Sequence, residues 1–211
     1  MIRVITVERE YGSGGLEIAS RLAESLGWEL VDNILVQKVA EQCRVKSSLA
    51  QCYDERRDPW YHRLGKAFWR GSPEVVLEPV QSQAFDSDLM VGHVRKLIEA
   101  AAERGNCVIV GRGAACILSR RMDAFHCFVY GCRTEKLEYA RRHISPEVSA
   151  EKLERVDKER AAYIREYFGL EWDNRKLYDL MINSAVGHEA VANAVISAAG
   201  LQKNVPELRS A

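Results

Sequence analysis

The chain has 211 residues and is 47% hydrophobic, enough to bury a sizeable core in one domain with an insertion or a small lid. Its 30 Lys and Arg side chains balance 30 Asp and Glu side chains, and this zero net charge argues against a general nucleic-acid or membrane surface. A local basic pocket stays compatible with that balance. No apolar run reaches membrane-spanning length, and the N-terminus has no signal-peptide pattern.

The cysteines indicate the compartment. There are 6 of them, and no two have C-x-x-C spacing. Cys107 and Cys127 lie inside apolar runs, where cysteine acts as a small hydrophobe. His126, Cys127 and Cys132 do not have the spacing of a common zinc ligand set. We therefore predict a reduced, cytoplasmic protein without a metal held by its own side chains.

The start of the chain predicts a strand, a glycine-rich loop and a helix. Residues 2–7 are β-branched or apolar except for one arginine, which is typical of a strand buried on both faces. Apolar residues then recur at helical spacing up to Leu26, and Gly27 supplies a stop. The loop between them contains Gly12, Ser13, Gly14 and Gly15. Such a loop can turn its backbone N–H groups toward an anion at the start of the helix.

This loop matches known nucleotide-binding patterns only in part. Aligned on a Walker A loop, Arg9 takes the first glycine, Gly15 the lysine and Leu16 the Ser or Thr. The dinucleotide-binding fingerprint also fails, because it requires glycine or alanine where Glu17 stands. Two interpretations stay open: a loop that binds an anion through its backbone, or an ordinary turn in which glycine permits tight packing.

The next segment places an acid at the end of a strand. Residues 28–32 read as a short second strand ending in Asp32, and residues 34–43 have helical spacing. An acid at the carboxyl end of a parallel strand lies where α/β sheets bind ligands. Asp32 could face a substrate, or it could simply precede the next helix. Residues 44–85 break the pattern with prolines and several aromatic residues, so we predict an insertion there.

A glycine-flanked arginine follows the third strand. A helix is predicted from residue 86 to the stop at Gly105, and residues 106–110 form a buried strand. Gly111 and Gly113 then flank Arg112, leaving room for the guanidinium to meet a planar oxyanion in bidentate fashion. The alternative is a loop arginine paired with a surface acid.

The rest of the chain continues the alternation of helices and strands. The predicted elements are a short helix at 114–121, a strand at 125–130, a helix at 134–143 capped by Thr134, a long helix at 151–168, a strand at 179–183 and a helix at 186–199. Five short, mostly apolar strands alternating with helices predict an α/β fold. Its five-stranded parallel sheet would carry helices on both faces and place the first strand centrally.

The long helix carries the charged residues Arg155, Lys158 and Arg160. Glu151 and Glu154 stand four residues before Arg155 and Lys158, so a salt-bridged, solvent-exposed helix explains these charges without any ligand. The charges on this helix therefore do not by themselves indicate a binding site.

Motifs spread over nearly the whole chain match those of a known family in the same order. The chain resembles the cytidylate kinase-like family of P-loop nucleoside monophosphate kinases. The matching segments are Arg-Glu-Tyr-Gly-Ser-Gly-Gly at 9–15, Asp32, Val-Gly-Arg-Gly at 110–113, Arg155 with Asp157, Lys158, Arg160 and Tyr163, then Trp172, Tyr178-Asp179-Leu180 and Asn183. The resemblance implies a P-loop kinase-type three-layer sandwich, as a single domain over 1–211 with a substrate-side insertion at about 44–85 and a helical lid at about 141–168.

The resemblance also implies roles for individual residues. By this resemblance, Asp32 and Arg112 contact a nucleoside monophosphate, and Arg155 and Arg160 belong to the lid that closes on phosphates. Gly12, Ser13, Gly14 and Gly15 would cradle ATP phosphates through their backbone. Arg9 and Lys158, with the lid arginines, would supply the charge of the missing lysine. The expected reaction is phosphoryl transfer from ATP, with Mg²⁺, to a nucleoside monophosphate, with CMP as the first candidate.

Two other functions stay open. Loss of both Walker A chemical groups is compatible with a non-catalytic nucleotide- or phosphate-binding protein. Because residues 44–85 match no acceptor pocket, a kinase for another small acceptor is the third alternative. In each case the partners are a nucleotide and a small molecule rather than nucleic acid or a membrane, and the sequence leaves the oligomeric state open.

Overall fold

A computed structural model describes residues 1–32 and 87–203 of the chain. The helix expected at 34–43 and the insertion expected at about 44–85 lie outside these residues. The strands are β1 (Val4–Arg9), β2 (Glu29–Val31), β3 (Cys107–Val110), β4 (Ala124–Tyr130) and β5 (Leu180–Asn183). The helices are α1 (Gly15–Leu26), α4 (Ser87–Arg104), α5 (Ala114–Ile117), α6 (Arg133–His143), α7 (Ala150–Phe168), the 3₁₀ turn η1 (Ser184–Val186) and α8 (His188–Ala198).

The five strands form one parallel sheet in the order β2-β3-β1-β4-β5. Val4 of β1 is in register with Cys107 of β3 on one side and with Ala124 of β4 on the other. Strand β1 is therefore central, as predicted. Because all strands run the same way, their carboxyl ends and the loops that follow meet at one edge of the sheet.

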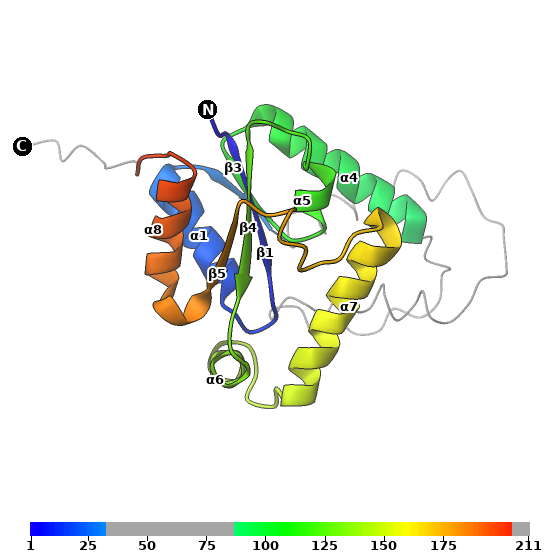
Figure 1. Ribbon diagram of the computed structural model, residues 1–211, viewed down its shortest axis with the longest axis vertical. Coiled ribbons are helices and arrows are strands. Elements are labelled where there is room, and N and C mark those ends of the chain that lie inside the picture. The colour runs from blue at the N-terminus through cyan, green and yellow to red at the C-terminus, as the bar shows by residue number, and fades with distance from the viewer. Residues whose placement is uncertain (33–86, 204–211) are drawn as a thin grey trace, which may run out of the picture.

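Helices cover both faces of the sheet, and alternation along β1 explains how. Ile5 belongs to a buried cluster with Leu22 of α1 and Val195 of α8, whereas Val4 belongs to another with Ile98 of α4. Successive side chains of a strand point to opposite faces, so one apolar strand supports both layers. Figure 1 shows α1 and α8 on one side and α4, α5 and α7 on the other, with α6 beyond the edge where β1 ends. The predicted three-layer α/β fold is confirmed.

Three element boundaries differ from the prediction. Helix α5 ends at Ile117 instead of residue 121, because the chain turns at buried Leu118, whose carbonyl accepts from the Arg121 N–H. Helix α6 begins at Arg133 with Cys132 as its N-cap, so the predicted cap at Thr134 is wrong. The last helix is preceded by η1, and α8 starts only after Gly187, whose φ of 97° interrupts the helical path.

The structure also bears on two smaller predictions. Cys107 and Cys127 are buried, as their apolar surroundings predicted. Over the described residues, no helix combines the length and apolar character that a membrane crossing requires.

Candidate functional site

The candidate site lies at the carboxyl edge of the sheet. Arg9 ends β1, Asp32 follows β2, Gly111 follows β3 and Gly131 follows β4. The chain positions that sequence reasoning selected on the first three strands are therefore brought to one edge by the parallel pairing. This edge is where open α/β sheets bind their ligands.

The glycine loop joins β1 to α1, and its residues 11–14 are buried. Gly12 and Gly14 have φ values of 84° and 72°, a left-handed conformation that glycine adopts without strain. A Cβ on Gly12 would lie 2.5 Å from the backbone oxygen of Lys136, and one on Gly14 would lie 2.3 Å from Nε2 of His188. Close packing therefore accounts for these two glycines, and anion binding by the loop is a separate proposal.

The acids beside the loop bond to groups outside it. Glu10 Oε2 accepts from the Gly131 N–H at 3.1 Å and pairs with Lys136 Nζ at 2.9 Å. Glu17 Oε2 accepts from the Tyr139 hydroxyl at 3.1 Å and lies 3.0 Å from His188 Nδ1. Both carboxylates are thus engaged with α6, α8 or the end of β4, rather than with the N–H groups of residues 12–15.

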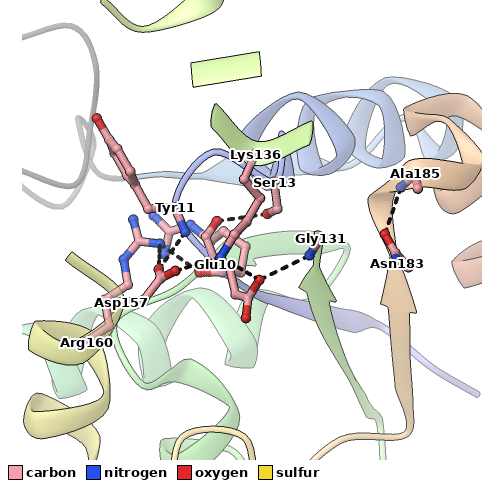
Figure 2. Close-up of polar contacts among 10 residues, drawn as sticks. Glu10, Tyr11, Ser13, Gly131, Lys136, Asp157, Arg160, Asn183 and Ala185 are labelled. Carbon is pink, nitrogen blue, oxygen red and sulfur yellow. Dashed lines mark hydrogen bonds and ion pairs between the residues drawn. The ribbon is translucent and has the colours of Figure 1, made fainter. Parts of the chain in front are cut away.

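Asp157 connects the long helix α7 to this loop. Its Oδ1 accepts from the backbone N–H of Tyr11 at 2.6 Å, and its Oδ2 lies 3.1 Å from Lys136 Nζ. Figure 2 shows Asp157 and Arg160 reaching the loop from α7 while Lys136 reaches it from α6. Burial raises the pKa of Asp157, although Arg160 and Lys136 partly counter that effect. Sequence reasoning gave no role to Lys136, which sits in no motif and becomes recognisable only through the folding of α6 over the loop.

Arg160 completes this connection. Its Nη1 donates to the backbone carbonyl of Arg9 at 2.7 Å and lies 3.8 Å from Asp157 Oδ1. Its guanidinium also lies over the Tyr11 ring, 5.7 Å from the ring centre. The structure therefore brings together two of the predicted charge-bearing residues, Arg9 and Arg160, whose sequence separation is 151.

Positive charge is concentrated beside the loop. Burial lowers the pKa of Arg9 to about 9, and the charges of Arg160 and Arg112 contribute to the shift. Burial lowers the pKa of Arg112 to about 9 as well, with Arg160 again contributing. Since like charges at close range disfavour one another, an anion bound among these arginines would relieve their repulsion.

Glu8 lies inside the apolar strand β1 and bonds to the turn at residues 111–113, which carries Arg112. Sequence reasoning overlooked this acid. It is only 3% exposed. One carboxylate oxygen accepts from the Gly113 N–H at 3.2 Å and the other from Trp172 Nε1 at 3.4 Å. Burial raises its pKa, while Arg9 has the largest opposing effect. Its charged partner and two donors make the buried carboxylate tolerable and fix the turn that follows β3.

The remaining predicted residues lie nearer the surface. Arg155 and Lys158 are exposed on α7, and Asp32 is half-buried after β2. Glu154 forms an ion pair with Arg133 at 3.1 Å, which links α7 to the start of α6.

The histidine and cysteines considered as zinc ligands, all within the described residues, do not form a metal site. His126 is buried and pairs through Nδ1 with the Thr6 hydroxyl at 2.8 Å. Within 1–32 and 87–203, no group of three His, Cys, Asp or Glu residues is placed to hold a metal ion.

These observations define the class of protein. A five-stranded parallel sheet in the order β2-β3-β1-β4-β5, with a glycine loop leading from the central strand into a helix, is a P-loop kinase-type fold. The model of the cytidylate kinase-like family matches residues 4–186. The chain belongs to the cytidylate kinase-like family.

Solved structures share this fold at low sequence identity. An uncharacterized protein from Eubacterium ventriosum is 21% identical, with a TM-score of 0.66 over 95% of this chain and 99% of that one. Shikimate kinase from Bacteroides thetaiotaomicron is 13% identical, with a TM-score of 0.53 over 95% and 100%. A gluconokinase from Sinorhizobium meliloti is 14% identical, with a TM-score of 0.52 over 94% and 91%. A comparison with curated protein sequences gives no significant match.

Proposed function

We propose that this protein transfers a phosphoryl group from ATP to a nucleoside monophosphate, with CMP as the first candidate. The observation that carries the proposal is the cluster of half-buried arginines beside the glycine loop, where Arg160 donates to the Arg9 carbonyl at 2.7 Å. Burial and mutual repulsion lower the pKa values of Arg9 and Arg112 to about 9. Phosphoryl transfer requires positioning and charge neutralisation more than covalent chemistry from the protein. A kinase-type fold with a surplus of arginine at the ligand edge fits that requirement.

Each site residue then has a proposed task. The backbone N–H groups of Gly12, Ser13, Gly14 and Gly15 hold ATP phosphates at the start of α1. Arg112 holds the acceptor phosphate with its planar guanidinium, and Asp32 orients the acceptor. Arg9 and Arg160 neutralise charge on the transferred group, in place of the absent loop lysine.

The outer residues of α7 belong to a proposed lid at about 141–168. Arg155 and Lys158 are exposed in the structure, so they would contribute only when α7 moves against bound phosphates. Closure of such a lid excludes water and limits hydrolysis of ATP.

Mg²⁺ would neutralise phosphate charge, and we propose that phosphate and water oxygens supply most of its ligands. The four cysteines within the described residues are free thiols, and we propose a cytoplasmic setting on that ground.

Two alternatives are tested by the same experiment. A non-catalytic nucleotide- or phosphate-binding protein is favoured by the absence of a lysine at Gly15 and of a hydroxyl at Leu16. A kinase for another small acceptor shares the fold and differs only in its acceptor pocket.

The experiment measures ADP formation by the purified protein with ATP and Mg²⁺. Acceptors are nucleoside monophosphates, shikimate, gluconate and simple alcohols, and an Arg9→Ala variant controls for contaminating kinases. Turnover with CMP that the variant loses supports the proposal. Turnover with only a non-nucleotide acceptor supports the third function, whereas saturable ATP binding without turnover supports the non-catalytic one.

A further inference from the structure

We propose that the terminal phosphoryl group of the nucleotide binds where the Asp157 carboxylate now lies, and that Asp157 competes with the nucleotide for this position. The donors of this subsite are the Tyr11 N–H, Lys136 Nζ and the Arg160 guanidinium. This inference rests on the proposed nucleotide binding at the glycine loop. It adds a lysine, supplied by α6, that the loop itself lacks.

The Asp157 carboxylate is coordinated in the way a phosphate would be. One oxygen receives the backbone N–H of Tyr11 at 2.6 Å, and the other receives the ammonium of Lys136 at 3.1 Å. The Arg160 guanidinium stands 3.8 Å away on the side of the first oxygen. A loop amide, an ammonium and a guanidinium around one anion are the donors that phosphate sites use. Figure 2 shows these groups converging on the carboxylate from the loop and from two helices.

Lys136 is placed to do the work of a Walker A lysine. The position of that lysine in the loop pattern is Gly15, which has no side chain. Lys136 instead reaches the loop from α6, whose backbone oxygen at Lys136 packs against Gly12. Glu10 also holds its ammonium at 2.9 Å, so the lysine stays beside the loop when Asp157 leaves.

A phosphoryl group would fill this position better than a carboxylate does. Burial opposes the charged form of Asp157 and raises its pKa, so the carboxylate is held at a desolvation cost. A terminal phosphoryl group carries more negative charge and more acceptor oxygens than a carboxylate. It would therefore satisfy the same donors more fully, and the Asp157 side chain would turn away while Arg160 on the same helix stays at the subsite.

The competing interpretation is a structural brace, in which Asp157 permanently ties α7 to the loop. The two interpretations predict different effects of one substitution on anion affinity. If Asp157 competes with the phosphate, Asp157→Asn removes the competing charge and strengthens anion binding. If Asp157 is a brace, the same substitution loosens the loop and weakens anion binding or leaves it unchanged.

The experiment measures the Kd of sodium tripolyphosphate and of ATP by isothermal titration calorimetry. We expect Asp157→Asn to bind both about tenfold more tightly than wild type, which corresponds to about 1.4 kcal/mol. Lys136→Gln should bind both about tenfold or more weakly, because it loses a charge-assisted contact. Asp123→Asn is the matched control, since it removes the same charge from a residue paired with Arg121 just before β4, and it should bind like wild type.

A second readout keeps the test independent of variant stability. In wild-type protein labelled with ¹⁵N-tyrosine, the Tyr11 amide resonance should shift on addition of tripolyphosphate, as its acceptor changes from carboxylate to phosphate. An unshifted Tyr11 resonance at saturating tripolyphosphate, or an Asp157→Asn variant that folds and binds no more tightly, overturns the inference. Turnover with CMP by wild type in that case would leave the proposed function standing.

Discussion

The carboxylate of Glu8 accepts a hydrogen bond from the backbone N–H of Gly113, with 3.2 Å between Oε1 and N. This bond crosses from the end of β1 to the turn after β3. The three residues of that turn all have positive φ, including 63° at Arg112, which is unusual for a residue with a side chain. A buried acid therefore holds the strained turn that presents the arginine to the ligand edge.

Glu8 should make stability depend on pH. Its folded pKa is raised above the reference value of 4.5, so its contribution to stability is fully present below about pH 4.5 and is lost as pH rises through the folded pKa. The Glu8→Gln variant lacks this loss. We expect its free energy of unfolding, relative to wild type, to improve between pH 4.5 and pH 7.5 in urea denaturation. A difference that is constant between the two pH values, or that moves the other way, would contradict this.

Arg112→Ala should weaken binding of the acceptor without unfolding the protein. The loss of one charge-assisted bidentate contact costs about 1.5–3 kcal/mol in binding free energy. Alanine and arginine have similar backbone strain at positive φ, so the melting temperature should change little. Titration with CMP measures the effect, and the exposed Arg120→Ala serves as control. An Arg112→Ala variant that melts and binds every ligand like wild type would show that Arg112 is not a ligand contact.

Arg9→Ala should lower nucleotide affinity more than Arg3→Ala does. Arg9 stands at the carboxyl end of β1 beside the glycine loop, whereas Arg3 donates to the carbonyl of Arg104 near the opposite end of the strand. Removing the Arg9 charge should cost roughly 1.5–3 kcal/mol in ATP binding, the range for a hydrogen bond to a charged group. Calorimetric titration of both variants with ATP provides the comparison, and equal affinities would remove Arg9 from the site.

The glycine loop should bind an anion through its backbone. A crystal grown in sulfate should show the anion about 2.7–3.2 Å from the N–H groups of residues 12–15.

Gly12→Ala should destabilise the protein more than Gly169→Ala. Both glycines have positive φ, 84° and 66°, so both variants lose about 1–2 kcal/mol to backbone strain. A Cβ at Gly12 would also collide with the Lys136 carbonyl, whereas one at Gly169 meets nothing within 4 Å. Overpacking should add roughly 1–3 kcal/mol at Gly12 alone. Urea denaturation measures the free energy of unfolding of both variants. Equal decreases would mean that α6 shifts to accommodate the added methyl group at little energetic cost.

Nucleotide should change hydrogen exchange across residues 141–160. This segment is rich in charge and contains Pro146, and its apolar anchors before Leu153 are Val148 and Ile144. Pairing of Arg155, Lys158 and Arg160 with phosphate should slow exchange of its backbone amides. The measurement compares exchange with and without ATP, with β3 as internal reference. Protection that is identical in both samples would rule out a lid in this segment.

Local pattern was sufficient to predict most of the fold. Apolar runs of strand length and helical spacing gave the five strands and their helices, since burial on both faces requires continuous apolar residues. The parallel sheet followed from the alternation of element types, whereas the pairing of β1 with β3 and β4 is known only from the structure. Element ends were less accurate: α6 begins before Thr134, because the end of a helix depends on neighbouring backbone as well as on a capping side chain.

The residue pattern alone was enough to predict the α/β architecture, the central strand, the glycine loop and the positions of Arg9 and Arg112 at strand ends. Which distant side chains meet there depends on how the helices pack in the folded chain. Lys136 and Glu8 lie in no motif, and Asp157 lies in one that assigned it no role; their roles arise because α6, α7 and the turn after β3 meet the end of β1 and the glycine loop. Periodicity records which face of an element is buried, but it carries no information on which charges from separate elements will share a desolvated space.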